Sequence, residues 1–188
     1  MQKLIAIVVP LQCLFLLVAF SSNSSMREVF PDTPPGTLTF IGDAGSPNVF
    51  TVEKWKFSRV ENLENPSEIG ITAVLDMRSI TCDWEDLQRS LHRKKEYFNS
   101  RRYQTAMLIV DGAELQEDGS YLTEAMLELK GKRKSIPITF TLGENEEGVP
   151  TVEAESVVMR RNWSFNGGGP KDEVPVTVSA ELVEFTEE

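Results

Sequence analysis

The sequence predicts an all-β domain with one short helical excursion, and three observations lead to that fold class. Apolar and polar residues alternate with a period of two along most of the chain after residue 36. About eight such segments follow one another at regular spacing, with turn-forming residues between them. One segment, residues 83–98, has helical periodicity instead. Eight strands spaced in this way favour an antiparallel barrel or a two-sheet sandwich, and the periodicity alone does not choose between them.

The size and charge of the chain limit what it can be. The chain has 188 residues, of which 40% are hydrophobic and 26% charged, which suits one ordinary globular domain. The formal net charge is −10, so the protein as a whole has no positive field that would attract phosphates. We therefore expect no nucleic-acid partner.

The first 21 residues have the composition of an export signal. Lys3 provides a short positive region, and an apolar run follows over residues 4–20. We expect cleavage after Ser21, because Ala19 and Ser21 fit the small-residue rule for the cleavage site. The rival interpretation is an uncleaved membrane anchor, since the run approaches the ~20 residues that a spanning helix needs. Pro10 and a glutamine interrupt the run and favour cleavage, so we expect an exported protein, periplasmic or secreted.

The composition changes again before the first strand. Three prolines and a glycine lie between Pro31 and Gly36, which predicts a flexible linker over residues 22–35 and a domain over residues 36–188. Removal of the signal leaves Cys82 as the single thiol, so no disulfide can form within the mature chain. We expect Cys82 to be a small structural residue.

The strands can be assigned in order from the alternation. Three strands are expected over residues 37–41, 50–60 and 69–77. The helical segment follows, with Trp84, Leu87 and Leu91 near helical spacing and Asp83 as the expected N-cap. Five further strands are expected over residues 103–110, 121–129, 136–142, 149–159 and 174–185.

Enzymatic patterns are mostly missing from the sequence. His92 is the single histidine, which argues against a multi-histidine metal site and against a Ser-His-Asp triad. The three glycines at residues 167–169 are not followed by a helix with a Lys-Ser/Thr pair, so they do not form a phosphate-binding loop. We therefore predict no catalytic residues, no metal site and no required cofactor.

Four stretches carry a further pattern. Residues 91–103 contain a leucine, paired aromatics and a tyrosine that leads into a strand, and residues 121–136 form a strand, a basic turn with a glycine and a second strand. Residues 160–165, Arg-Arg-Asn-Trp-Ser-Phe, combine an arginine, an aromatic and a small residue, and residues 172–178 lead from an acidic turn into a valine-rich strand. Together they resemble the YceI-like family, exported lipocalin-like proteins known for binding polyisoprenoid lipids.

The resemblance implies both a fold and a function. The fold is an eight-stranded antiparallel lipocalin-like barrel with one short helical excursion. The function is that of a carrier, which sequesters a long apolar isoprenoid-type lipid, a polyisoprenoid or a quinone, inside the barrel. The alternative that stays open is a secreted β-rich structural or interaction module, whose interior is filled and which binds no small ligand. The sequence makes no prediction of oligomeric state.

The candidates to line the lipid tunnel are large apolar side chains on the expected strands and their flanks. The alternation does not fix the strand register, and plain core packing is the alternative role for each of them. They are Phe40, Phe50, Trp55, Phe57, Leu75, Met77, Phe98, Tyr103, Met107, Ile109, Leu127 and Phe140.

Charged residues supply candidates for contacts outside the tunnel. Arg160 and Trp163 form a polar-aromatic pair that is a candidate for contact with a lipid head group or for a cation–π contact, whereas in the alternative Arg160 satisfies backbone carbonyls. The basic runs at residues 92–95 and 130–134 could make transient contact with lipid phosphates at a membrane surface, and solvated turns are the alternative.

Overall fold

The computed structural model describes residues 28–43, 47–167, 169 and 171–186. The predicted signal, residues 1–21, and the first part of the predicted linker lie outside the described residues. No helix in the described ranges has the length and apolar character needed to cross a membrane.

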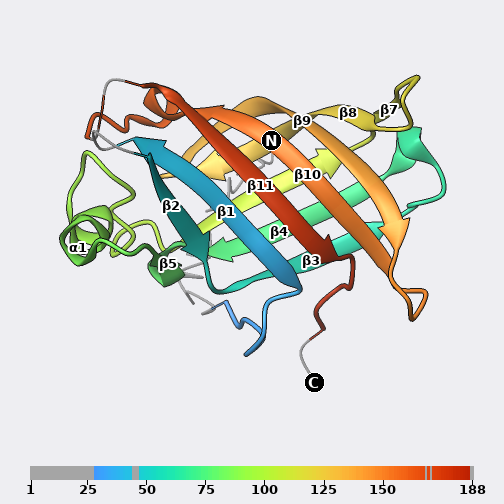
Figure 1. The fold of residues 1–188 in the computed structure, drawn as a ribbon, viewed down its shortest axis with the longest axis horizontal. Coiled ribbons are helices and arrows are strands. Elements are labelled where there is room, and N and C mark those ends of the chain that lie inside the picture. Colours follow the sequence, from blue (N-terminus) through green and yellow to red (C-terminus); the bar gives the residue numbers. More distant parts are fainter. Residues whose placement is uncertain (1–27, 44–46, 168, 170, 187–188) are drawn as a thin grey trace, which may run out of the picture.

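The strands form a single antiparallel sheet that curls around a common interior (Figure 1). Its order is β3-β4-β6-β8-β9-β10-β11-β1-β2-β5, with β7 paired to the edge of β8. The bounds are β1 Gly36–Asp43, β2 Pro47–Val52, β3 Trp55–Glu61, β4 Gly70–Asp76, β5 Ile80–Thr81, β6 Thr105–Asp111, β7 Glu114–Leu115, β8 Tyr121–Leu129, β9 Lys132–Glu144, β10 Pro150–Met159 and β11 Glu173–Glu181.

Two sharp bends explain why the structure has more strands than the sequence predicts. Only residues 53 and 54 separate β2 from β3, and only the three residues of a 3₁₀ turn, 77–79, separate β4 from β5; β2 pairs with β5, and β3 pairs with β4. There the backbone N–H of Asp76 donates to the Lys54 carbonyl at 2.9 Å, and that of Glu53 donates to the Ser79 carbonyl at 3.3 Å. When β2 and β3 are counted as one bent strand, β4 and β5 as another, and the two-residue β7 is set aside, the sheet is an eight-stranded up-and-down barrel. The predicted fold class is confirmed.

The bent strand also closes the barrel. Its first half, β2, pairs with β1, and its second half, β3, pairs with β4. The remaining edge of β3 is covered by the C-terminal segment, where the Phe185 N–H donates to the Phe57 carbonyl at 2.8 Å. On the outside of β3, the Lys56 ammonium pairs with Glu28 at 3.1 Å and lies 5.1 Å from the centre of the Phe185 ring.

In the part of the chain that the structure describes, one α-helix interrupts the strands, as predicted, and three short 3₁₀ helices occupy connections. Helix α1 spans Glu85–Arg93, and η1, η2 and η3 span Pro66–Glu68, Met77–Ser79 and Arg160–Trp163. Helix α1 is shorter than the predicted segment. Its N-cap is Trp84 rather than Asp83, without a side-chain cap, and it ends because Lys94 is extended. Buried Leu87 and Leu91 attach the helix to the barrel.

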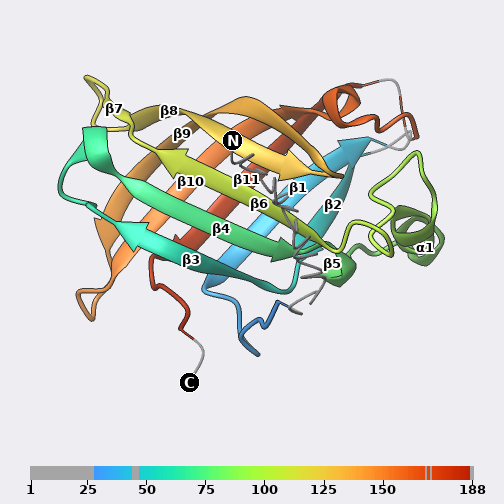
Figure 2. The ribbon, with the colours of Figure 1, turned by 180° about the vertical axis from the view of Figure 1, so that it is seen from behind.

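The two ends of the barrel are closed by different segments (Figures 1 and 2). The helix end carries α1, the connection 94–104, the turn 130–131 and the loop 160–172; the Lys130 ammonium joins these segments through the carbonyls of Lys95 and Ser164. The opposite end carries the connections 62–69 and 112–120 and the turn 145–149.

Candidate functional site

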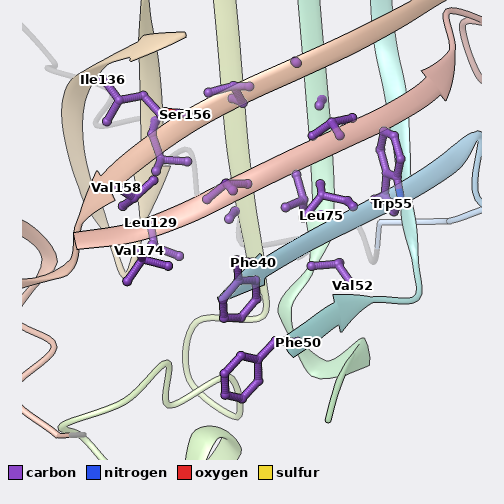
Figure 3. A pocket seen from close by; sticks show the side chains of 18 of the residues that line it. Phe40, Phe50, Val52, Trp55, Leu75, Leu129, Ile136, Ser156, Val158 and Val174 are labelled. Carbon is purple, nitrogen blue, oxygen red and sulfur yellow. The ribbon is translucent and has the colours of Figure 1, made fainter. Parts of the chain in front are cut away.

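The interior of the barrel contains an apolar cavity of about 250 Å³. Its lining comes from strands all around the barrel, because every second residue of a strand faces inward. Figure 3 shows Leu129, Ile136, Val158 and Val174 on one side of the cavity, Trp55, Leu75 and Val52 on the other side, and Phe40 and Phe50 between them.

The cavity has two different walls. On β3 and β4, which we call the packed wall, the inward residues include Trp55, Phe57 and Ala73, all buried. On β10 and β11, which we call the open wall, the inward side chains are small. Val152 and Ala180 are buried, and the others are half-buried even though they face the interior: Ala154, Ser156, Val158, Val174, Val176 and Val178. The free space lies beside the open wall because its side chains do not reach across the barrel.

The cavity extends to the helix end of the barrel. There its lining includes Arg160, Phe165, Gly167 and Lys171 from the loop that joins β10 to β11. Charged side chains therefore lie where the apolar interior meets this loop.

Nine of the twelve predicted lining residues lie on the cavity wall. They are Phe40, Phe50, Trp55, Phe57, Leu75, Met77, Phe98, Leu127 and Phe140. Several are arranged as ring pairs: Phe40 stacks on Phe50 at 4.8 Å, and Phe98 meets Phe165 edge to face at 4.7 Å.

The other three predicted residues do not line the cavity. Ala106, Leu108 and Val110 of β6 face inward, so Met107 and Ile109 lie on the opposite face of that strand. Tyr103 precedes β6, and its ring lies 5.3 Å from the Arg102 guanidinium. The prediction chose the wrong face of β6 because both of its faces are apolar.

Arg160 organises its own loop. Its Nη1 donates to the carbonyls of Phe165 at 3.0 Å and Gly167 at 2.5 Å, and its Nε donates to the Lys171 carbonyl at 2.7 Å. Its Nη2 donates to the Gly169 carbonyl. The side chain therefore has the role given in the alternative interpretation, which is to satisfy backbone carbonyls.

Trp163 is placed differently from the prediction. Its side chain is completely buried, does not line the cavity and donates from Nε1 to the Lys132 carbonyl at 3.0 Å. Trp163 therefore does not reach the cavity that Arg160 lines, because its indole instead holds the start of β9 against the loop.

Lys130 is a buried cation that sequence reasoning noted only as part of a basic run. Its Nζ donates to the carbonyls of Lys95 at 3.0 Å and Ser164 at 3.1 Å, and it lies 4.3 Å from the centre of the Phe165 ring, which lines the cavity. Burial lowers the pKa of Lys130, the neighbouring Lys132 lowers it further, and Glu96 acts in the opposite direction. A positive charge is therefore held beside the helix end of the cavity.

One polar atom of the packed wall has no partner. Trp55 is completely buried, and its Nε1 donor makes no hydrogen bond to any residue that the structure describes. Such a donor is destabilising by about 1–3 kcal/mol if it stays unpaired. The indole N–H is therefore unsatisfied, and because it has almost no accessible surface, an acceptor inside the barrel reaches it only when the ring turns toward the cavity.

His92 has a structural role. Its Nε2 donates to the Ile80 carbonyl at 3.2 Å, which leaves Nδ1 to accept from the Ser100 hydroxyl at 2.7 Å. The side chain is half-buried and ties α1 to β5, rather than being solvated as part of the run 92–95. Within the described ranges, no group of three or more His, Cys, Asp and Glu side chains could hold a metal ion.

Sequence reasoning missed the small residues of the open wall. Candidates were chosen for size, and the valines of β11 are small, although Val174, Val176 and Val178 alternate visibly in the sequence. It also missed Tyr97 and Phe165, which lie in connections where strand periodicity gives no signal.

Solved structures with the same fold have low sequence identity to this chain. BcnA of Burkholderia cenocepacia is 15% identical, with a TM-score of 0.66 over 77% of this chain and 94% of BcnA. A polyisoprenoid-binding domain from Saccharophagus degradans, implicated in plant cell wall breakdown, is 13% identical, with a TM-score of 0.58 over 80% of this chain and 94% of that one. The YCEI protein of Campylobacter jejuni is 10% identical, with a TM-score of 0.59 over 71% of this chain and 82% of that one.

The family assignment comes from the sequence itself. No curated protein matches the chain. The family model of the YceI-like domain matches residues 37–182, which is most of the chain and includes every strand except the first residue of β1. The barrel, its apolar interior and this match agree, and the chain belongs to the YceI-like domain family.

Proposed function

We propose that this protein is an exported carrier that binds a long apolar isoprenoid-type lipid inside its barrel. The observation that carries the proposal is the apolar cavity of about 250 Å³. For comparison, an apolar cavity of about 150 Å³ in another protein stays dry and binds benzene. Each methylene group that moves from water into such a cavity contributes about 0.8 kcal/mol, without demanding a particular direction.

The relatives support this class of ligand. The domain from Saccharophagus degradans is described as polyisoprenoid-binding, and it shares this fold over 80% of the present chain. A branched, flexible isoprenoid tail suits a cavity with ring faces on several sides and small valines on the open wall.

The unpaired N–H of Trp55 favours a ligand with one oxygen acceptor. When the indole turns toward the cavity, a quinone carbonyl or a polyprenol hydroxyl can accept from Nε1 and remove the penalty of the buried, unpaired donor. A pure hydrocarbon would leave that donor unsatisfied. We therefore expect the ligand to combine an isoprenoid tail with a small oxygen-bearing group.

Export and transient membrane contact complete the proposal. The apolar run after Lys3 supports an address outside the cytoplasm. A long isoprenoid lipid partitions into bilayers because its tail is apolar, so loading and release require contact with a membrane. The carrier performs no chemistry on its ligand.

Native mass spectrometry tests the proposal. The full chain is expressed with its own N-terminal segment and purified without detergent, and bound molecules are then extracted with organic solvent and identified. We expect a stoichiometric isoprenoid lipid, and at 100 times Kd added ligand should stabilise the fold by about 2.7 kcal/mol. An empty protein that gains no thermal stability from added prenyl lipids would overturn the carrier function in favour of a structural or interaction module.

A further inference from the structure

Charge is distributed very unevenly between the two ends of the barrel. At the helix end, residues 92–104, 130–134 and 160–173 contain twelve Lys and Arg against three Asp and Glu. At the opposite end, residues 61–69, 111–120 and 144–149 contain ten Asp and Glu and no Lys or Arg. A protein with a net charge of −10 thus has one cationic end.

The cations at the helix end are mostly free to meet an external anion. Lys94, Lys95 and Arg101 in the connection after α1 are exposed, as are Arg161 and Lys171 in the loop after β10. Among the residues that the structure describes, Arg133 alone of the twelve forms an ion pair, with Glu128 at 2.7 Å.

Neighbouring acidic groups do not cancel this charge. The start of α1 adds three acidic residues, Asp83, Glu85 and Asp86, and one basic residue, Arg89, which pairs with the last two. The excess of basic over acidic residues at this end therefore falls from nine to seven. Among the twelve cations, Lys130 is buried against backbone carbonyls and an aromatic ring, with no carboxylate at ion-pair distance in the described part of the chain. The helix end therefore keeps a positive excess.

Exposed apolar side chains lie at the same end. Trp84, which precedes α1, is 49% exposed. Ile41 and Val49 are 44% and 58% exposed and pair directly across β1 and β2 near the turn at the helix end. Trp84 is flanked by Asp83, Glu85 and Asp86, and it lies at the same end of the barrel as the cationic segments. Exposed tryptophans are enriched on surfaces that sit at the interface between water and lipid.

We propose that the helix end docks on the surface of a membrane that contains anionic phospholipids. The cationic segments contact lipid phosphates, Trp84 enters the head-group region, and the end of the cavity lined by Arg160 and Lys171 faces the bilayer. The proposal names the site of lipid transfer, and in that respect it rests on the proposed carrier function.

The acidic end does not oppose docking, because it is remote. Strand β8 alone has nine residues, which corresponds to about 30 Å along the strand and, for a tilt of about 40°, to about 23 Å along the barrel axis. The Debye length at physiological ionic strength is about 8 Å, so the membrane interacts with the near end and hardly with the far one. The separation of charge therefore orients the protein with its cavity toward the lipid.

Tryptophan fluorescence provides a direct test. The chain has three tryptophans, and Trp55 and Trp163 are completely buried, so a change in solvent exposure reports mainly on Trp84. The full-length protein is titrated with vesicles of phosphatidylcholine and with vesicles of equal parts phosphatidylcholine and phosphatidylglycerol. We expect a blue shift and co-sedimentation with the anionic vesicles that fall as salt is added, and little of either with the zwitterionic ones.

A matched pair of variants separates the surface from net charge. Lys95→Gln with Arg101→Gln removes two positive charges at the helix end and should weaken binding to the anionic vesicles roughly thirtyfold. Leu115→Glu with Val183→Glu makes the same change in net charge at exposed positions of the opposite end. This control should bind within about twofold of the parent, because its new charges lie beyond the screening distance.

The outcomes are distinct. Equal binding to both kinds of vesicle, no binding to either, or equal losses of binding in the two variants would overturn the docking surface. If neither kind of vesicle binds, an acidic protein would be the partner that matches the cationic end. Native mass spectrometry of the same samples reports on the carrier function separately. Retained lipid without a preference for anionic vesicles overturns docking alone, whereas anionic-vesicle binding without any retained lipid supports docking and overturns the carrier function.

Discussion

The packed wall and the open wall of the barrel differ in the size of their inward side chains, and that difference creates the cavity. On the packed wall, Trp55 and Phe57 meet edge to face at 5.3 Å and are 0% and 4% exposed. On the open wall, Val174, Val176 and Val178 face the same interior and stay half-buried. An eight-stranded barrel is just wide enough to be filled by its own side chains, so small residues on one wall leave room for a ligand.

The largest expected effect comes from truncating the two walls in turn. Phe57→Ala should destabilise the ligand-free protein by about 3–5 kcal/mol, because it opens a hole in close-packed surroundings. Val176→Ala should cost only about 1 kcal/mol, because its side chain already borders free space. Denaturant unfolding of both variants measures the difference, and equal losses would contradict the distinction between the walls.

Enlarging one small residue on each wall tests the same difference from the opposite direction, by adding volume instead of removing it. Ala73→Phe on the packed wall should destabilise the protein by about 3 kcal/mol through overpacking, since Ala73 is 5% exposed and surrounded by neighbours. Ala154→Phe on the open wall should change stability by less than about 1 kcal/mol, because the ring can occupy the cavity.

Ligand retention completes this test. Ala154→Phe should lower the amount of lipid that copurifies while the fold remains intact, because the ring takes the place of the ligand. Ala154→Val is the conservative control at the same position and should retain more lipid than the phenylalanine variant. If Ala154→Phe retained lipid fully, the ligand would lie elsewhere.

The wall positions show what could be predicted from the sequence. The alternation predicts strands because one face of each strand is apolar, and it succeeds on β9, where Ile136, Ile138 and Phe140 are buried and the residues between them are exposed. It fails on β6, because Met107 and Ile109 are as apolar as their inward neighbours. Register there is set by pairing with β4 and β8, which no local pattern encodes.

The candidate site was predictable only in part for a related reason. Large aromatic residues such as Phe40 and Phe140 indicate an interior, but the space beside them depends on which small residues face them across the barrel. The bend between β2 and β3 is also invisible in the apolar pattern of residues 50–60, because it depends on contacts of Lys54 and Glu53 with a distant turn.

That turn makes the packed wall sensitive to acid. Asp76 ends β4, where its carboxylate accepts from the Arg78 backbone N–H at 2.9 Å and from Nε and Nη2 of Arg78, each at 2.8 Å. Burial by itself raises the pKa of Asp76, but the hydrogen bonds and the charge of Arg78 outweigh it and hold the pKa below its ordinary value. The ionised group therefore stabilises the fold above the pKa it has in the unfolded chain, about 4.

Asp76→Asn should lower the free energy of unfolding by about 2 kcal/mol at neutral pH, because charge-assisted hydrogen bonds at the corner are lost. The difference from the parent should shrink as the pH falls below about 4 and through the lower folded-state pKa, since the parent carboxylate is then protonated as well. Unfolding curves at pH 7 and at acid pH measure it. A difference that is the same at both pH values would mean that the charge of Asp76 does not hold the corner.

The smallest expected change in stability tests how the packed wall recognises its ligand. Trp55→Phe keeps a ring on the wall but removes the unpaired Nε1 donor, so the loss of packing and the relief of the buried donor act in opposite directions. We expect the stability of the ligand-free protein to change by less than about 1 kcal/mol. Binding of a prenylated quinone or a polyprenol should weaken about tenfold, as expected for one lost hydrogen bond, whereas binding of an isoprenoid hydrocarbon should hardly change. If the affinities for all three ligands fell by the same factor, Trp55 would contribute only shape to binding. The hydrogen-bond donor to the ligand oxygen would then have to lie on the open wall.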